Sequence, residues 1–363
     1  MPGGTAAGRA SSTATAFAAV VLVGLNLRTV FASLPPVLDD VRSDLGLGAA
    51  VAGLLTTGPL LCFGGFALAG PRLARRLPIE RLLVLFLALT ALGTVVRGIA
   101  GVAGLFAGTL LAGAAVALAQ TLVPILVRTR YAARAGLLTG GYTMALTLGS
   151  AIASGTAVPF EHGFASWRWA LAVYAVPAAV GVAVCLADRE RTVVERAPAL
   201  DLHRLRGSWS IALYFGFQSM AFYAGLTWLP TILESHGFSE SGAGALQAAS
   251  NAVQFVPAFL VPVFAGRRRH QTGVLVALVS LGVAGIGGLL AAPGAALLWM
   301  FVLGIAQGGM LGLGMVLPVL RGGSGAAVAG LTAMALSVGY LIAAAGPFLL
   351  GASHDLTGGW TTP

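Results

Sequence analysis

Residues 14–38 read ATAFAAVVLVGLNLRTVFASLPPVL, an apolar run whose one charged side chain is Arg28. As a helix rising about 1.5 Å per residue, the run is long enough to cross the roughly 30 Å hydrocarbon core of a bilayer. Arg28 lies near the middle of the run, too far from either headgroup layer for its side chain to snorkel out. A guanidinium held there costs at least about 2.5–3.5 kcal/mol on insertion scales. A compensating group is therefore expected, and its identity bears on function.

Composition extends the membrane interpretation to the whole chain. The 363 residues are 57% hydrophobic and 9% charged, whereas about 25% of the residues in a soluble domain are charged. All 21 basic residues are arginine, which excludes a Walker A phosphate-binding loop and a lysine Schiff base. The apolar runs contain no Ser-His-Asp, zinc-ligand or nucleotide-binding pattern. We therefore expect no enzymatic activity, no catalytic residue, no cofactor and no metal site.

Eleven apolar runs, each of about 18–27 residues, predict an all-α, polytopic membrane protein. They cover 14–38, 49–70, 80–97, 101–125, 135–158, 167–187, 208–233, 242–265, 272–291, 295–318 and 325–351. We expect a disordered tail over 1–13, an N-terminal six-helix bundle over 14–187, a cytoplasmic linker over 188–207 and a C-terminal bundle over 208–363. Both cysteines, Cys62 and Cys185, lie inside runs, so no disulfide framework is implied.

The arginines are distributed unequally between the two sides of this layout. Seventeen fall on the side of the N-terminus and the linker, whereas Arg42, Arg97 and Arg168 fall in connections on the other side. Since arginine-rich connections stay cytoplasmic, the pattern predicts a multi-pass protein of the cytoplasmic membrane with its N-terminus inside. The formal charge of +9 then needs no nucleic-acid partner. The expected partners are the lipid bilayer and a small-molecule substrate, and we expect a monomer.

The two halves of the chain repeat each other at a nearly constant offset. LPPVL at 34–38 recurs as LPTIL at 229–233, PILVR at 124–128 as PVLR at 318–321, and AGL at 135–137 as AGL at 329–331. Six runs separate the copies, so the halves share one topology, as in transporters whose halves are related by an axis along the membrane normal. Trp167, which opens the sixth run, maps onto Trp360. We therefore expect a twelfth helix to begin there and to be missing, with a protein of eleven spans and an outside C-terminus as the alternative.

Short motifs spread over the chain carry a family likeness. They are GLNLR (24–28), AGLLTT (52–57), PRLARR (71–76), GLLTGGYT (136–143), WRWAL (167–171), FQS (217–219), FYAGLTWLP (222–230), AQGG (306–309) and HDLTGGW (354–360). With these motifs the chain resembles a major facilitator superfamily transporter, most of all the cyanate / 2-nitroimidazole transporter branch. The resemblance implies twelve helices in two six-helix bundles, a central cavity and alternating access.

One superfamily signature is degenerate in this sequence. The loop between the second and third spans usually reads G-x-L-A-D-R-x-G, but here Pro71, Arg75 and Pro78 occupy its glycine, aspartate and glycine places. We therefore do not transfer the gating salt bridge of that aspartate to this chain.

No acidic residue lies deep in an apolar run. Those predicted outside are Asp39, Asp40, Asp44, Glu161, Glu234, Glu240 and Asp355, and those predicted inside are Glu80, Asp188, Glu190, Glu195 and Asp201. Arg28 therefore has no carboxylate partner of its own, and its counter-charge is expected on the substrate; pairing with helix-end carbonyls is the alternative. The same absence argues against a carboxylate proton relay. His354 and Asp355 are expected in an outside loop, without metal chemistry.

Polar residues in the runs give the other candidate substrate-binding residues. The offset of 195 maps Arg28 onto Tyr223, its expected counterpart across the pseudo-twofold axis. The remaining candidates are Gln218, Gln120, Gln307, Tyr142, Tyr340, Asn251 and Gln254. The last two form a polar stripe with Gln247, which is expected to line the cavity, with hydrogen bonds between helices as the alternative. Asn26, about 200° around the helix from Arg28, has the same two interpretations.

These residues together predict a secondary transporter that moves a small anionic or nitro- or carboxylate-bearing solute, cyanate-like or nitroimidazole-like. Efflux of drugs or metabolites is an alternative, and a membrane sensor or scaffold that does not transport is another. Arg28 is the expected anchoring charge for the solute.

Overall fold

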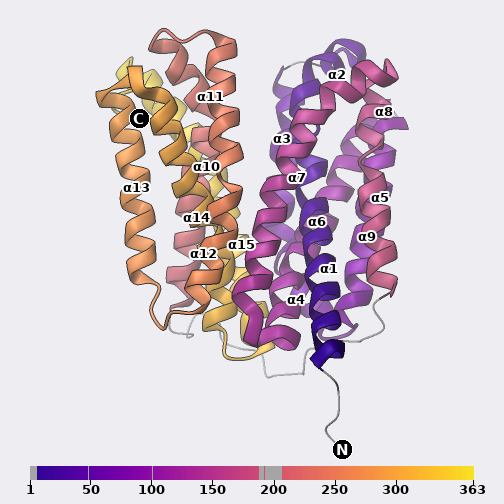
Figure 1. The fold of residues 1–363 in the computed structure, drawn as a ribbon. Helices are drawn as coiled ribbons and strands as arrows, with labels where there is room; N and C mark the ends of the chain where they lie inside the picture. The colour runs from indigo at the N-terminus through magenta and orange to yellow at the C-terminus, as the bar shows by residue number, and fades with distance from the viewer. Residues whose placement is uncertain (1–5, 48, 100, 188–191, 193–206) are drawn as a thin grey trace, which may run out of the picture.

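The computed structural model describes residues 6–47, 49–99, 101–187, 192 and 207–363. Within them the chain is helical, without strands, as the composition predicts. The first and second halves form two lobes that stand side by side (Figure 1). Of the linker predicted over 188–207, the description covers Thr192 and Gly207, so Asp188, Glu190, Glu195 and Asp201 lie outside it.

The elements of the first lobe follow the six predicted runs, the sixth being divided between α8 and α9. They are α1 (Ala6–Ala32), η1 (Pro35–Val37), α2 (Leu38–Leu45), α3 (Ala49–Phe66), α4 (Gly70–Ala74), α5 (Ile79–Ile99), α6 (Gly101–Tyr131), η2 (Ala132–Arg134), α7 (Ala135–Phe164), α8 (Trp167–Ala172) and α9 (Ala175–Ala187).

The second lobe is built in the same way, and its second run is divided between α11 and α12. Its elements are α10 (Ser208–Ser235), α11 (Glu240–Val253), α12 (Phe255–Gly266), α13 (Thr272–Ala291), η3 (Pro293–Ala295), α14 (Ala296–Arg321) and α15 (Gly325–Thr357). Eight stretches of the described residues are long and apolar enough to cross a membrane, and one of them, Gly101–Phe164, holds both α6 and α7. The number of eleven spans remains a prediction.

The bounds of α1 differ from the sequence prediction at both ends. The helix begins at Ala6, inside the tail predicted to be disordered. It ends at Ala32, before the predicted Leu38, since Pro35 lacks an N–H and disfavours helical geometry in the residue before it. Arg28 therefore lies about one turn from the end of α1.

Arg97 departs from its predicted place in an outside connection. Its side chain is 1% exposed, and it donates to the backbone oxygen of Val30 and, over 3.0 Å, to Ser33 Oγ. The last carbonyls of a helix lack intrahelical partners and carry negative partial charge. A guanidinium at the end of α5 therefore folds inward to cap the end of α1.

The end of the chain also differs from its prediction. His354 and Asp355, expected in a loop, belong to the last turns of α15, which closes at Gly358 with a left-handed φ of +68°. Trp360, expected to open a further helix, packs instead with its ring centroid 4.0 Å from that of His354 and 5.2 Å from that of Trp228.

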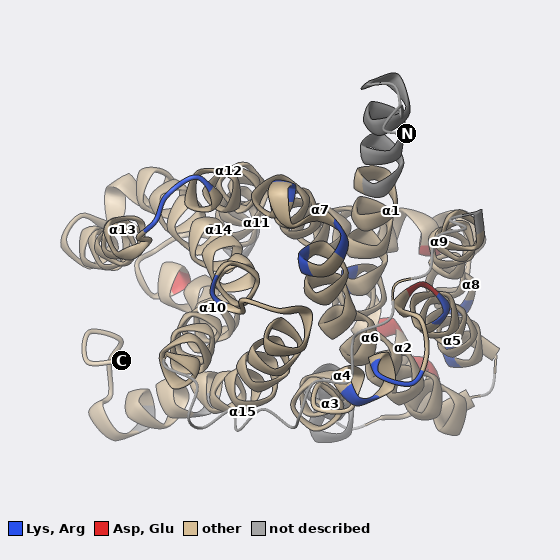
Figure 2. Ribbon diagram, turned by 90° about the horizontal axis from the view of Figure 1, so that it is seen from below, with Lys and Arg blue, Asp and Glu red and all other residues tan. Residues whose placement is uncertain are grey.

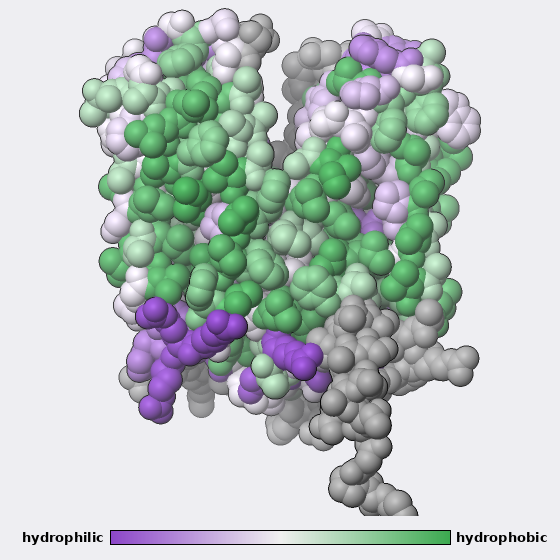
Figure 3. Space-filling view, viewed as in Figure 1, coloured by the Kyte–Doolittle hydropathy of each residue, from purple (hydrophilic) through white to green (hydrophobic). Residues whose placement is uncertain are grey.

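The surface of the two lobes is a broad apolar belt with a polar lower edge (Figure 3). Exposed arginines follow α12 at 267–269 on this edge, and the view from below shows basic residues on several connections (Figure 2). The start of α1 lies at the same end of the molecule (Figure 1). Among the described residues the fold thus gathers arginine-rich connections at one end, as the sequence predicts.

The two lobes are joined by close backbone packing. A Cβ added to Gly136 would lie 2.7 Å from the backbone oxygen of Pro262, and one added to Gly140 would lie 2.5 Å from that of Phe259. Thr143 Oγ1, on the same helix α7, donates to the backbone oxygen of Ala258 on α12. At the opposite end, near α2 and α11, Figure 3 shows a notch between the lobes.

Candidate functional site

Arg28 connects the two lobes through hydrogen bonds to two tyrosines. Its Nη1 donates to the Tyr223 hydroxyl on α10 over 3.1 Å, and its Nη2 donates to the Tyr340 hydroxyl on α15 over 3.3 Å. Both tyrosines belong to the second lobe, whereas Arg28 belongs to the first. The two residues paired by the repeat offset of 195 are therefore in contact. No carboxylate in the described part of the chain forms an ion pair with Arg28.

Tyr340 is held in place from both lobes. Its ring stacks on Phe63 of α3 with the centroids 4.7 Å apart, and its edge meets Phe215 of α10 at 5.6 Å. Gln120 Nε2 on α6 donates to the Tyr340 hydroxyl over 3.4 Å. The side chain is 1% exposed. Packing from three helices thus fixes the direction in which this hydroxyl meets Arg28.

Tyr142 brings a third phenol to this region from α7. It is fully buried and close enough to Arg28 and Tyr340 to interact with both electrostatically. Gly24 makes this position available, since a Cβ there would lie 2.9 Å from the backbone oxygen of Tyr142 and 3.1 Å from its ring. The glycine of the GLNLR motif therefore has a packing role one turn before the arginine.

Two polar atoms at this site have no hydrogen-bond partner among the described residues. They are the Tyr142 hydroxyl and Gln120 Oε1, and both are buried. Leaving such a group unpaired costs about 1–3 kcal/mol, and most buried polar atoms in proteins are satisfied. A polar ligand beside Arg28 would find these two groups available.

Three other candidates from the sequence form hydrogen bonds with residues other than Arg28. Gln218 Nε2 donates to the neighbouring Ser219 Oγ over 2.7 Å. Asn251 Oδ1 accepts from Gln254 Nε2 at 2.9 Å and from Gln247 Nε2 at 3.3 Å, so the polar stripe is bonded within its own α11–α12 segment. The structure records no hydrogen bond between these residues and Arg28 in the part of the chain it describes.

Two further polar side chains, Asn26 and Gln307, differ in their hydrogen bonding. Asn26 Nδ2 donates to the backbone oxygens of Leu22, at 2.8 Å, and Pro177, at 3.0 Å. The hydrogen bond between helices, one of its two interpretations, is thus present, to α9, while the buried Oδ1 of Asn26 has no partner within the described ranges. Gln307 on α14 is half-buried, and its Oε1 has no partner within the described ranges.

The aromatic surroundings of Arg28 were not predicted. Phe63, Phe215 and Phe31, whose ring centroid lies 5.5 Å from that of Phe63, join Tyr340 in one aromatic cluster. Sequence offers no signal for them, because a phenylalanine inside an apolar run is equally suited to face lipid. For the burial of Arg97 the sequence held one signal, the neighbouring Gly98. In the structure Gly98 packs closely on the backbone of Arg168, so this end of α5 lies against α8.

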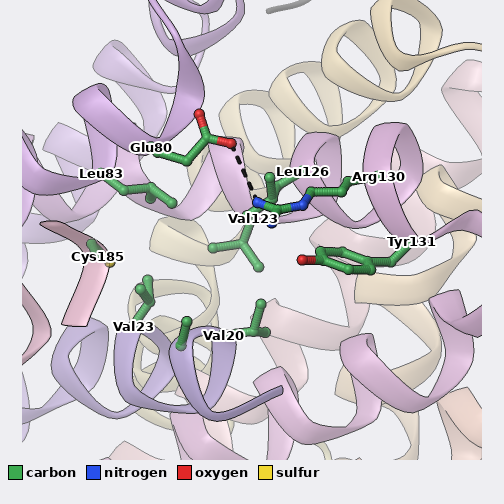
Figure 4. Close-up of a pocket in the computed structure, with 10 residues that line it drawn as sticks. Val20, Val23, Glu80, Leu83, Val123, Leu126, Arg130, Tyr131 and Cys185 are labelled. Carbon is green, nitrogen blue, oxygen red and sulfur yellow. Dashed lines mark ion pairs between the residues drawn. The ribbon is translucent and has the colours of Figure 1, made fainter. Parts of the chain in front are cut away.

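A separate pocket lies within the first lobe (Figure 4). Its walls are mainly apolar, with Val20, Val23 and Leu83 among them. At one side Arg130 Nη1 lies 3.7 Å from Glu80 Oε1, and Glu80 also accepts hydrogen bonds from the backbone N–H and the hydroxyl of Thr192. The carboxylate thereby fastens this point of the linker to α5, which explains the buried pair without a ligand.

The chemistry available at Arg28 is recognition of a compact anion or an electronegative group. A guanidinium presents a planar fork of N–H donors that matches carboxylate and nitro geometry, and phenol hydroxyls can donate or accept. In surroundings of low dielectric constant these interactions are stronger than in water. Neutral aromatic rings on several sides favour a small, flat solute.

Comparison with known proteins places these features in context. The family model described as Major Facilitator Superfamily matches residues 16–347. The chain is 33% identical to the uncharacterized transporter YycB of Bacillus subtilis (strain 168), over 95% of this chain and 87% of that protein. It is 32% identical to the 2-nitroimidazole transporter of Escherichia coli (strain K12), over 95% and 90% respectively.

Two further likenesses agree with these. The cyanate transport protein CynX of Escherichia coli (strain K12) is 27% identical, over 94% of this chain and 90% of that protein. Among solved structures, the proton:xylose symporter XylE bound to 6-bromo-6-deoxy-D-glucose superposes with a TM-score of 0.75 at 15% identity, covering 96% of this chain and 90% of that one. That likeness concerns the fold.

Proposed function

This chain belongs to the Major Facilitator Superfamily, and on that premise we propose that it carries a small anionic or nitro- or carboxylate-bearing solute by alternating access. Its relatives are transporters, so it is a membrane transport protein and not an enzyme. Cyanate-like and nitroimidazole-like solutes are the proposed cargo. The observation that carries the proposal is the environment of Arg28, whose charge has neutral phenols as its hydrogen-bond partners.

The electrostatics of Arg28 support an anionic or electronegative cargo. Removing a charge from water is costly unless it is paired and hydrogen-bonded. The phenols of Tyr223 and Tyr340 supply hydrogen bonds but no negative charge. A cargo with a negative or strongly electronegative group would supply it. The names of two relatives, a 2-nitroimidazole transporter and a cyanate transport protein, point to solutes of this kind.

We assign roles at the site from its geometry. Arg28 is the anchoring charge. Tyr142 and Gln120, with polar atoms that lack partners in the described structure, are proposed as further cargo ligands. Tyr223 and Tyr340 hold Arg28 from the second lobe and are not assigned as cargo ligands. Gln218, Asn251, Gln254 and Gln307 stay outside this proposed set, because within the described residues no interaction connects them with Arg28 or Tyr340, whereas Gln120 bonds Tyr340 and Tyr142 interacts with Arg28 electrostatically.

The distribution of arginines supports an orientation in the cell membrane. The end that carries them and the N-terminus would be cytoplasmic. The notch near α2 and α11 would then face outward, and the close packing of α7 on α12 would separate the site from the cytoplasm. We infer that the structure has the outward-facing conformation of the transport cycle.

Uptake into proteoliposomes tests the proposed function. Purified wild-type protein is expected to take up radiolabelled cyanate or 2-nitroimidazole, and Arg28→Gln should reduce uptake by about ten- to hundredfold, the factor expected from a lost charge-assisted hydrogen bond. Arg28→Lys should also fail, because an ammonium lacks the planar fork. The matched control is Arg268→Gln, at an exposed arginine. Uptake by Arg28→Gln equal to the control would overturn the assignment.

A further inference from the structure

The hydrogen bonds of Arg28 cross the boundary between the lobes that must move relative to each other during transport. Nη1 and Nη2, the two ends of the guanidinium fork, are each bound to a phenol of the second lobe, at 3.1 Å and 3.3 Å. A cargo anion would need the same N–H groups. Cargo and phenols are therefore alternative ligands of one cation.

This competition matters for the step in which the carrier returns without cargo. Net transport requires the unloaded site to pass through a closed conformation, whereas exchange of cargo for cargo requires only the loaded site to do so. Closing protein around an unpaired guanidinium is strongly unfavourable. A carrier that had Arg28 and no substitute ligand would therefore be confined to exchange.

The two tyrosines have the properties that a substitute ligand requires. A phenol oxygen accepts hydrogen bonds from a guanidinium yet stays uncharged, so an anion with a full negative charge can displace it. Tyr340 is buried and packed between Phe63 and Phe215, and so holds its position. Tyr223 is only half-buried and has room to yield. Cargo would therefore displace Tyr223 first.

We propose that Tyr223 and Tyr340 satisfy Arg28 whenever the carrier is unloaded, and so allow this protein to perform net transport and not only exchange. The inference rests on the proposed function. It assigns to the two tyrosines a role in the step in which the unloaded carrier returns, where they position Arg28. This role is distinct from a contribution to the affinity for the cargo.

The test compares two modes of transport in the same proteoliposomes, with radiolabelled cyanate and, in parallel, 2-nitroimidazole. Exchange is measured with unlabelled cargo inside and labelled cargo outside. Net uptake is measured with empty vesicles, valinomycin and potassium holding the membrane potential at zero. The variants are Tyr223→Phe, Tyr340→Phe and the double variant. Tyr214→Phe is the control, since its hydroxyl bonds the backbone oxygen of Met310 within the second lobe, 2.8 Å away.

The ratio of net uptake to exchange is the decisive quantity. In the double variant net uptake should fall about ten- to hundredfold, as for the loss of a hydrogen bond to a charged group, while exchange stays within about threefold of wild type. Each single variant should show a smaller fall, and these carry the test if the double variant does not fold. Tyr214→Phe should leave the ratio unchanged.

Three results would overturn the inference, and they differ from one another. An equal loss of net uptake and of exchange would show that the tyrosines are cargo ligands or structural groups. Unchanged net uptake in a folded double variant would show that Arg28 needs no substitute ligand. Absence of both modes in wild-type protein, for both probes, would remove the proposed function itself and this inference with it.

Discussion

Replacing Gly140 by alanine should shift the conformational equilibrium of the carrier. Gly140 lies on α7 at the contact with α12, and a Cβ there would sit 2.5 Å from the backbone oxygen of Phe259, whereas ordinary contacts begin near 3.4 Å. The two backbones would have to separate by about 1 Å. Overpacking of this kind typically costs about 1–3 kcal/mol, and here it penalises the conformation in which the lobes are packed at this contact.

The shift follows from that cost. If the alternative conformation separates α7 from α12, a penalty of about 1–3 kcal/mol changes the ratio of the two populations by about 5- to 150-fold. Gly155→Ala is the matched control, because it is on the same helix and a Cβ there meets nothing within 4 Å.

Distances between spin labels provide the assay. Labels would be introduced at Ser43→Cys and Ala245→Cys, exposed residues of α2 and α11, the helices near the notch. Cys62 and Cys185 would first be replaced by alanine. Gly140→Ala should move the distance distribution toward shorter separations, while Gly155→Ala should match the parent. A distance distribution in Gly140→Ala that is indistinguishable from that of the parent would refute the reasoning that the contact between α7 and α12 is present in only one of the two conformations.

Other substitutions test the surroundings of the site. Arg97→Gln should destabilise the protein by about 1–3 kcal/mol in thermal unfolding, because its bonds to the end of α1 are lost. Arg168→Gln, which removes an exposed ion pair with Asp44 at 2.8 Å, should lower the stability by at most about 1 kcal/mol. Equal losses of stability in these two variants would contradict the role of Arg97 as a buried cap of α1. Asn26→Leu should lower stability by about 0.6–1.7 kcal/mol without changing which solutes compete for uptake, and altered selectivity would return Asn26 to the cargo site.

The fold was largely predictable because its signals are long and repeated. Runs of apolar residues at membrane length gave the helices, and the offset between halves gave their common topology. The same offset selected Tyr223 as the counterpart of Arg28, and the two side chains are hydrogen-bonded. The predicted all-α, two-bundle architecture is confirmed by the family match and the structural likeness. The exact bounds of the bundles stay predictions.

The candidate site was predictable only in part, for a geometric reason. Helical periodicity gives the face on which a polar residue lies, but not which neighbour that face meets. Gln218 and Asn251 were chosen by their polarity, and the structure has them bonded within their own segments. Arg97 was misplaced because hydropathy marks where a run ends, whereas a long side chain can fold back from that point into the protein.

Equilibrium binding of radiolabelled cyanate and 2-nitroimidazole to purified wild-type and Arg28→Gln protein tests the central claim most directly, because it needs neither coupling nor conformational exchange. The account predicts saturable binding to wild-type protein and an affinity lower by about ten- to hundredfold in a folded Arg28→Gln variant. Equal affinities in the two proteins would contradict the claim that this cation anchors the cargo.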